Sequence, residues 1–319
     1  MIRIVTDTGS DILSDEAKTM GVDSLELRIE FDGKTYDQQQ DKDFSTFYKN
    51  VKASRKKDLT IHSVEQKDFE TIFAEARDNE DEVLVLTVAR SINGGTFDAA
   101  RNAQSECRYG GISLMDTGHV SFAQRILVER ALKLRDEGMG LEAIRKDLDD
   151  VAKRIYIVGF ADNFLRIYKG DLVEMNYGMA FRRQAVSAKP IISWDDGKLG
   201  FETTAFGVKR AFNAVWTKFD ITGYDEAFPV WFGHVNARDR GEAFMQASVA
   251  NFNLKPEEST LYDMGGLFGQ MVGPKSVFIA FVRPLPPVIE EEEYEDEEEE
   301  DGPPRLRKSD MEETGYRLG

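Results

Sequence analysis

A buried strand that is followed by a glycine-containing turn and a helix constrains the fold of this chain most. Residues 83–88 are a continuous apolar run rich in β-branched side chains, which predicts a strand covered on both faces. Residues 89–96 include two adjacent glycines and predict a turn, and residues 97–104 predict an amphipathic helix. The free N–H groups at such a helix start suit an anion. A plain strand-to-helix connection with Thr96 as the N-cap also explains these residues.

The rest of the chain alternates between predicted strands and helices and divides into three parts. Residues 1–154 read β-α-β-β-α-α-β-α-β-α, which is typical of an α/β domain with a mostly parallel sheet. Residues 155–287 predict a smaller, mixed α+β domain. Residues 288–319 follow a group of prolines and are dominated by acidic side chains, so we expect a disordered tail.

Three further glycine-containing segments predict loops or hairpins. Asp32-Gly33 predicts a tight hairpin between the extended residues 24–31 and 34–36. A second hairpin is expected around Asp195-Asp196-Gly197, and residues 265–269 predict another glycine-rich loop.

Composition and charge restrict the class of protein. The chain has 319 residues, 41% of them hydrophobic, and its one cysteine excludes a disulfide framework. The formal net charge is −17, of which the segment from Glu290 onward carries −10, so the remaining residues are only mildly acidic and nucleic acid is a poor partner. No apolar run reaches the roughly 20 residues of a membrane span. The first residues predict a strand and not a signal peptide, so we expect a cytoplasmic protein.

Motifs for catalysis, metal binding or nucleotide binding are missing from the sequence. The three histidines lack metal-ligand spacing, and there is no phosphate-binding loop, dinucleotide fingerprint or nucleophile elbow. Asp7 with Asp11, and Asp116 with His119, follow predicted strands, where catalytic groups can lie. Helix capping explains the first pair equally well.

Six short motifs, in the same order along residues 2–283, resemble those of the DegV family. They are Thr6-Asp-Thr-Gly-Ser-Asp11, Phe31-Asp-Gly-Lys-Thr-Tyr36, Ser91-Ile-Asn-Gly-Gly-Thr-Phe97, Asp116-Thr-Gly, Ala188-Lys-Pro-Ile-Ile192 with Asp196-Gly-Lys198, and the glycine-rich residues 265–274. Each motif alone is weak, but six in order are specific.

The resemblance implies a two-domain α/β protein that binds one long-chain fatty acid between its domains. Some members of the family are the carrier subunit of a bacterial fatty acid kinase, and they present the acid to a separate ATP-binding kinase. A carrier of this kind is a binding protein and not an enzyme, and it needs no cofactor. A long acyl chain also suits an apolar site, since burial stabilises each CH₂ by roughly 0.8 kcal/mol.

The resemblance also places the carboxylate site, and this chain departs from it. The family's head-group serine falls on Gly94, its threonine on Ile61 and its histidine on Met271. The arginines that we associate with the kinase-facing surface fall on Phe206 and Val208. The lipid-binding residues expected here are Thr60, Ile61, His62, Ser91, Asn93, Gly94, Gly95, Thr96, Gln270 and Met271.

Three hypotheses remain open from the sequence. The first is a lipid-binding protein with an altered carboxylate site, because the acyl chain supplies most of the binding energy. The second is a diverged relative that no longer binds lipid and acts as an interaction or structural protein, with the acidic tail as its recognition element. The third is an enzyme that uses Asp7, Asp116 and His119.

Overall fold

A computed structural model describes residues 1–31, 33–36, 46–49, 59–162, 164, 167 and 177–286. The predicted tail at 288–319 lies outside the described residues. Met1–Leu285 form one compact unit. The division of this unit at residue 154 into two domains stays a prediction, although strand pairing does change from one sheet to another at that point.

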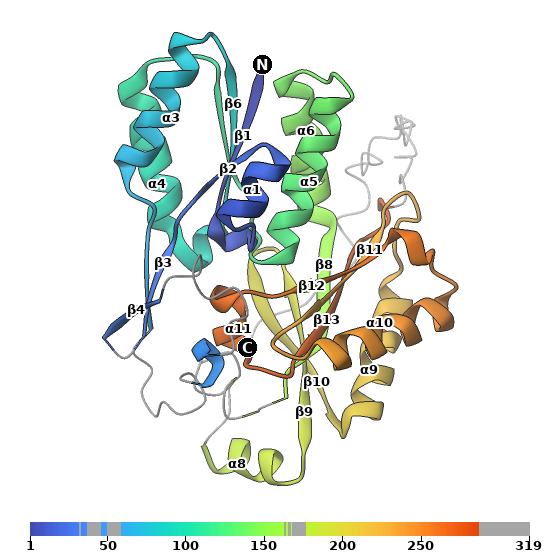
Figure 1. Ribbon diagram of the computed structural model, residues 1–319. Helices are drawn as coiled ribbons and strands as arrows, with labels where there is room; N and C mark the ends of the chain where they lie inside the picture. Colours follow the sequence, from blue (N-terminus) through green and yellow to red (C-terminus); the bar gives the residue numbers. More distant parts are fainter. Residues whose placement is uncertain are drawn as a thin grey trace, which may run out of the picture. The chain divides into compact units, whose positions relative to one another are not determined.

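A four-stranded parallel sheet confirms the α/β prediction for the first half of the chain. Its strand order is β2-β1-β6-β7, and every neighbouring pair is parallel. The strands are β1 (Ile2–Asp7), β2 (Val22–Leu25), β6 (Glu82–Thr87) and β7 (Ile112–Asp116). Figure 1 shows α3 (Gln66–Asp78) and α4 (Arg90–Cys107) on one side of this sheet, with α5 (Phe122–Asp136) and α6 (Leu141–Arg154) on the other. Residues Val83–Thr87 of β6 are buried, as the continuous apolar run predicted.

The extended residues 24–31 do not form one strand, which corrects that expectation. The parallel pairing of β2 with β1 ends at Leu25, opposite Asp7, and α1 (Ser14–Met20) precedes β2. The chain then turns away at Leu27, whose N–H donates to Thr8 Oγ1 at 2.9 Å. A separate three-stranded sheet, β4-β3-β5, follows, made of β3 (Arg28–Phe31), β4 (Lys34–Tyr36) and β5 (Leu59–His62). The predicted hairpin is confirmed by the antiparallel pairing of β3 with β4.

A six-stranded mixed sheet, β10-β9-β8-β13-β11-β12, confirms the prediction for the second half. Its strands are β8 (Ile155–Phe160), β9 (Ala188–Asp195), β10 (Lys198–Phe206), β11 (Val230–His234), β12 (Ser259–Asp263) and β13 (Val277–Val282). The second predicted hairpin corresponds to the antiparallel pair β9–β10. The described helices of this half are α8 (Tyr177–Ala185), α9 (Val208–Thr222), α10 (Arg238–Phe252) and α11 (Gly266–Val272).

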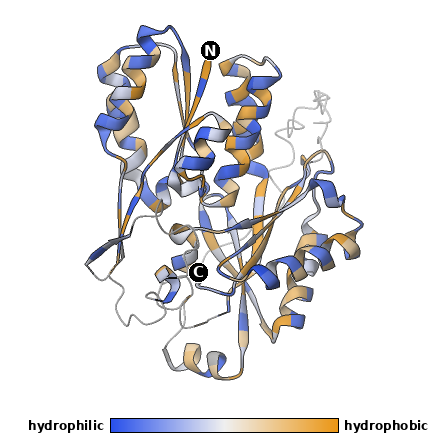
Figure 2. Ribbon diagram, viewed as in Figure 1, coloured by the Kyte–Doolittle hydropathy of each residue, from blue (hydrophilic) through white to orange (hydrophobic). Residues whose placement is uncertain are grey.

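The two faces of the mixed sheet belong to different hydrophobic cores. In β13, Val277, Ile279 and Phe281 join the core beneath α9 and α10. The alternate residues Phe278 and Ala280 join the core that also contains the parallel sheet. Figure 2 shows the resulting apolar strands in the interior, with hydrophilic positions on the outer surfaces of the helices. Because one core includes residues of both sheets, α11 and the parallel sheet are held in the same packed region.

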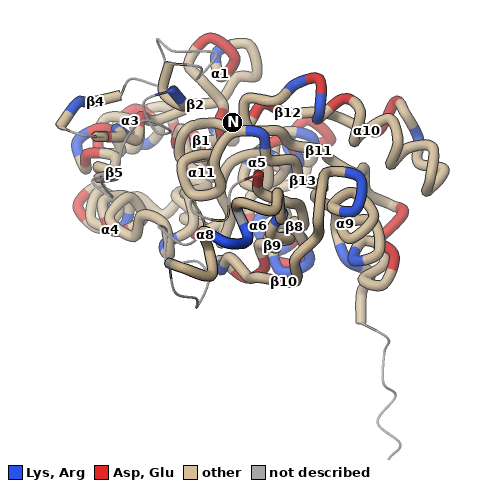
Figure 3. The backbone as a smooth tube through the Cα atoms, turned by 90° about the horizontal axis from the view of Figure 1, so that it is seen from below, with Lys and Arg blue, Asp and Glu red and all other residues tan. Residues whose placement is uncertain are grey.

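Charges are mixed along the described helices. Lys and Arg are interspersed with Asp and Glu along α3, α4 and α9 (Figure 3). None of the described helices has the length and hydropathy needed to cross a bilayer. The same part of the chain contains no cluster of His, Cys, Asp and Glu that could hold a metal ion.

Candidate functional site

The glycine-containing turn after β6 is helical, which corrects the first prediction. Helix α4 begins at Arg90 and is interrupted at Asn93, whose φ of −148° and ψ of 86° are not helical. A second helical segment therefore starts at Gly94. Asn93 Oδ1 accepts a hydrogen bond from the N–H of Thr96 at 3.0 Å, so Asn93 and not Thr96 is its N-cap. The sequence did not identify Asn93 as an N-cap, because a helical turn already precedes it.

The Asn93 side chain joins this helix start to the end of β5. Its Nδ2 donates to the carbonyl of Ile61 at 3.2 Å, and its Oδ1 accepts from Ser63 Oγ at 2.8 Å. Thr96 Oγ1 accepts from the N–H of Val64 at 3.2 Å. The structure thus brings together two of the three segments that were expected to bind a head group, β5 and the start of α4.

The β5 residues of the expected site do not all face inward. Thr60 and His62 are exposed, and His62 Nε2 lies 3.1 Å from Glu30 Oε2 on the surface. Ile61 is half-buried and packs against the core. Of these three residues, Ile61 is therefore the one whose side chain reaches the interior, and it is apolar.

The two glycines at the start of the second α4 segment have different surroundings. Their N–H groups belong to the first turn, where the helix dipole is positive and intrahelical acceptors are missing. A Cβ built on Gly94 would meet no atom within 4 Å, whereas one on Gly95 would lie 2.2 Å from Ser63 Oγ. The open space is therefore at Gly94, where the family resemblance places a serine.

Two hydroxyl groups near this helix start already donate to protein atoms. Ser91 Oγ donates to the carbonyl of Gly197, in the β9–β10 turn, at 2.7 Å. Ser63 Oγ donates to Asn93 Oδ1. Sequence reasoning missed Ser63. Its only signal in the sequence is a hydroxyl at the end of a strand.

The predicted glycine-rich loop at 265–269 is mostly helix, which is a second correction. Gly265 is the N-cap of α11, and Phe268 on this helix contacts the rings of Trp194 and Phe278. Tyr48 Oη donates to the carbonyls of Met264 and Gly265 at 3.0 and 3.1 Å. Tertiary contacts therefore stabilise a short helix that its glycine content disfavours.

Helix α11 packs against β3, and β3 pairs with β5. A Cβ on Gly266 would lie 3.5 Å from Ile29 Cδ1, and Ile29 is the register partner of Ile61. The expected residues Gln270 and Met271 are half-buried on this helix. All three expected segments thus belong to one contiguous region.

Two residues of the enzyme hypothesis, Asp7 and Asp116, accept hydrogen bonds from backbone N–H groups. Asp7 is buried, and its carboxylate accepts from Gly9 N at 2.9 Å, Val88 N at 2.8 Å and Gln124 Nε2 at 3.1 Å. Burial raises the pKa of Asp7 to about 6. Asp116 Oδ1 accepts from the N–H of Arg90 and of Gly118 at 3.2 and 3.0 Å.

The third member, His119, is buried and has its own partner. Its Nε2 lies 2.8 Å from the carbonyl of Ala152. Burial lowers the pKa of His119, so the ring is neutral near pH 7. None of the contacts of Asp7, Asp116 and His119 described above joins one of the three side chains to another.

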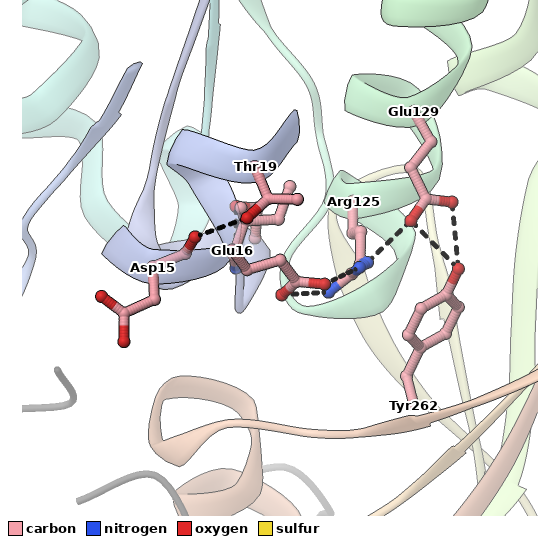
Figure 4. A network of polar contacts seen from close by, with 8 residues as sticks. Asp15, Glu16, Thr19, Arg125, Glu129 and Tyr262 are labelled. Atoms are coloured by element: carbon pink, nitrogen blue, oxygen red, sulfur yellow. Dashed lines mark hydrogen bonds and ion pairs between the residues drawn. The ribbon is translucent and has the colours of Figure 1, made fainter. Parts of the chain in front are cut away.

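A polar network attaches β12, the strand before α11, to the helices of the parallel sheet. Arg125 of α5 donates to Glu16 at 2.9 Å and to Glu129 at 2.8 Å. The Tyr262 hydroxyl donates to the Glu129 carboxylate at 3.0 Å, and its ring lies 4.7 Å from the Arg125 Cζ atom. Figure 4 shows the two carboxylates on either side of the guanidinium group.

Two surface cavities with volumes of about 770 and 280 Å³ are lined by described residues. The larger one lies beside β7 and α6, and the smaller one beside the segment before β11. Neither is lined by any of the ten residues expected to bind lipid, so these cavities are separate from that region.

Comparisons with known proteins agree with this architecture. The family model described as "Uncharacterised protein, DegV family" matches residues 1–284. A DegV domain-containing protein of Caldanaerobacter subterraneus subsp. tengcongensis is 27% identical over 231 residues, which are 71% of this chain and 79% of the relative.

Solved structures share the fold. A fatty-acid-binding DegV family protein from Thermus thermophilus aligns with a TM-score of 0.74 and 24% identity, over 88% of this chain and 99% of its own. A stearic acid-binding protein from Eubacterium ventriosum aligns with a TM-score of 0.72 and 17% identity, over 89% and 98%. At these identities the likeness establishes the fold.

Proposed function

This chain belongs to the DegV family, and from that premise we propose that it holds one long-chain fatty acid between its parallel and mixed sheets, with an altered carboxylate site. The related structures from T. thermophilus and E. ventriosum are of proteins that bind fatty acids. The proposal carries that ligand class over to this chain.

One observation supports the location of the head group. The second segment of α4 begins at Gly94, and Asn93 holds this helix start against β5. The N–H groups of Gly94 and Gly95 lie in the first turn, where the helix dipole favours a carboxylate. The open space at Gly94 can take one oxygen of the ligand in place of a serine side chain.

Apolar burial supplies most of the affinity in this proposal. A chain of about 14 methylenes gains on the order of 10 kcal/mol gross on leaving water. The family's three side-chain contacts to the carboxylate are replaced by Gly94, Ile61 and Met271. Each lost hydrogen bond to a charged group is worth roughly 1.5–3 kcal/mol, so their loss weakens binding while the contribution of the buried acyl chain remains.

Presentation of the acid to a separate ATP-dependent kinase is a separate question from lipid binding. The positions where the resemblance places arginines carry Phe206 and Val208, and Phe206 is 52% exposed. The surface at Phe206 is therefore apolar where the resemblance places a cation, which argues against the same kinase contact in this chain. Lipid binding needs no kinase and is tested without one.

Native mass spectrometry of the full chain purified from cells tests lipid binding directly. We expect a mass increment equal to one long-chain fatty acid, which organic extraction removes and which stearic acid restores. The fatty alcohol of the same length is the control for the carboxylate.

The outcomes separate the hypotheses. Binding of the acid with little preference over the alcohol supports a site dominated by the apolar wall and backbone donors. If neither ligand binds and no increment appears, the lipid-binding proposal is rejected and the interaction protein takes its place. A strong preference for the acid would show that a further side chain reads the carboxylate, and Gln270, which is half-buried on α11, would be mutated first.

A further inference from the structure

Three hydroxyl groups near the start of the second α4 segment already donate their hydrogens to protein atoms. Ser63 Oγ donates to Asn93 Oδ1 at 2.8 Å, and Thr96 Oγ1 donates to the same oxygen at 3.0 Å. Ser91 Oγ donates to the carbonyl of Gly197 at 2.7 Å. A hydroxyl group has one hydrogen and two lone pairs. Toward a ligand these side chains therefore act as hydrogen-bond acceptors and not as donors.

The bonds around Asn93 are sheltered from water. Asn93 is 7% exposed, and Thr96 is fully buried. Thr96 Oγ1 also accepts from the N–H of Val64 at 3.2 Å, so its hydroxyl group is held from both sides. A carboxylate that took a hydrogen from this network would break a buried bond, and that loss would offset part of the gain.

The segments expected to contact the head group hold few positive charges. In β5, the start of α4 and α11, the side chains that can be cationic are Arg90 and His62. Both are exposed. Arg90 lies 3.2 Å from the carboxylate of Asp98, and His62 lies 3.1 Å from that of Glu30. Each of these groups therefore already has an anionic partner at the surface.

The interior offers no further cation for a bound carboxylate. Among the residues that the structure describes, Lys189 is the one buried lysine or arginine, and its Nζ binds Asp162 Oδ1 at 2.8 Å. Burial of a carboxylate without a cation is unfavourable, because its hydration is lost without an equal replacement. An uncharged head group avoids this penalty.

The shape of the region also suits a head group with a hydroxyl. Gly94 is half-buried, and a Cβ built on it would meet no atom within 4 Å. A Cβ on Gly95 would lie 2.2 Å from Ser63 Oγ, so this hydroxyl lies against the helix start. The other replaced positions, Ile61 and Met271, pack against the core. An uncharged head group can accept from a backbone N–H here and donate its own O–H to Ser63 Oγ.

We propose that this site binds a monoacyl lipid with an uncharged, hydroxyl-bearing head group at least as tightly as the fatty acid of the same length. Fatty alcohols and monoacylglycerols share this chemistry. The proposal rests on the proposed lipid-binding function and names the ligand class of the same site. A site built for a carboxylate would have the opposite preference, since the acid anion carries only acceptors.

Competition at one acyl length tests this preference in the full wild-type chain. The fluorescent fatty acid cis-parinaric acid is displaced in turn by octadecanoic acid, octadecanol, 1-octadecanoylglycerol and methyl octadecanoate. We expect the alcohol and the glycerol ester to displace the probe at the same concentration as the acid or at a lower one. The methyl ester donates no hydrogen bond, so it should bind about two- to tenfold more weakly than the alcohol.

Ser63→Ala removes the proposed acceptor. This variant should bind the alcohol and the glycerol ester about two- to tenfold more weakly and the methyl ester as tightly as the wild type. Ser105→Ala is the matched control, because the Ser105 hydroxyl on α4 donates to the carbonyl of Arg101 at 2.9 Å, within its own helix. Equal losses in the two variants, or an equal loss for the methyl ester, would overturn the proposal.

Gly94→Leu fills the space expected to hold the head group. It should weaken binding of the glycerol ester by about tenfold, and binding of the smaller methyl ester by less. Gly110→Leu is the control, because Gly110 is also open and has no positive φ, but it lies beside β7. If Gly94→Leu binds the glycerol ester as tightly as the wild type, the head group lies elsewhere and the proposal is overturned.

The results for the acid separate this proposal from lipid binding itself. If the acid binds about tenfold more tightly than both the alcohol and the glycerol ester, the ligand class is overturned and fatty acid binding stands. If none of the four ligands binds, by displacement or by native mass spectrometry, both proposals are rejected. Where a variant does not fold, the four wild-type affinities decide.

Discussion

Helices α4 and α11 both contain glycines near their starts, and the surroundings of these glycines are opposite. In α4, a Cβ on Gly94 would meet no atom within 4 Å. In α11, a Cβ on Gly269 would lie 1.9 Å from the hydroxyl oxygen of Tyr48, and one on Gly266 would lie 3.2 Å from Phe47. Both segments predict loops from sequence, and both are helical.

The difference shows that glycine serves two purposes here. At Gly269 the missing side chain lets an aromatic ring pack against the helix backbone, which is a requirement of stability. At Gly94 the missing side chain leaves space beside a helix N-terminus, which is available to a ligand. Substitutions at Gly269 and Gly94 test this distinction, and a substitution at Asn93 tests the helix start beside Gly94.

The largest effect is expected for Gly269→Ala. The added methyl group would displace Tyr48, which is buried and donates to Met264 and Gly265. Overpacking and the weakened hydrogen bonds should lower the free energy of unfolding by about 2–3 kcal/mol, measured by urea denaturation.

Gly94→Ala is the matched control for this measurement. Gly94 does not have a positive φ, and its surroundings are open. We expect a change of less than about 1 kcal/mol, toward higher stability, because alanine restricts the unfolded chain. Equal losses in the two variants would contradict the assigned difference between the helices.

An intermediate effect is expected for Gly94→Ser, which restores the family side chain. One hydrogen bond to a carboxylate is worth roughly 1.5–3 kcal/mol, or about ten- to a hundredfold in affinity. Isothermal titration with stearic acid should show this gain, and the matching alcohol should show little. Gly94→Asp occupies the same space with a negative charge and should weaken acid binding. A gain in both variants would mean that the side chain acts through the apolar wall.

The smallest effect is expected for Asn93→Ala, which removes the cap of the second α4 segment. Loss of the Asn93 contacts to Thr96 and Ile61 should lower the free energy of unfolding by about 1–2 kcal/mol. Asn93→Asp keeps the accepting oxygen and should recover more than half of the loss. Full stability of Asn93→Ala would show that α4 needs no cap at its interruption.

The fold follows from local patterns that depend little on tertiary contacts. The apolar run of β6 and the amphipathic pattern of residues 97–104 predict a buried strand and a helix that covers it, because apolar side chains recur on the face of an element that packs against the core. The hairpin around Gly33 was likewise predicted from its local turn residues.

The sequence predicted only part of the candidate site, because the site depends on contacts between distant segments. The six family motifs located its three segments, but not the direction of their side chains, so Thr60 and His62 were included although both are exposed. Ser63 was missed because its role depends on Asn93, 30 residues away. Contacts of this length have no local signature.

What the sequence determined by itself is the α/β class, the family and the order of the strands and helices, because apolar periodicity and turn residues act over a few positions. The tertiary structure alone decided that glycine-rich residues 265–269 are mostly helical and that Asn93 joins the start of the second α4 segment to β5. In both cases the deciding groups come from distant segments. Tyr48 stabilises α11 from over 200 residues away along the chain, and Asn93 contacts Ile61 and Ser63 from 32 and 30 residues away. Short-range propensity disfavours this helix, and only the free energy of these long-range contacts reverses the preference.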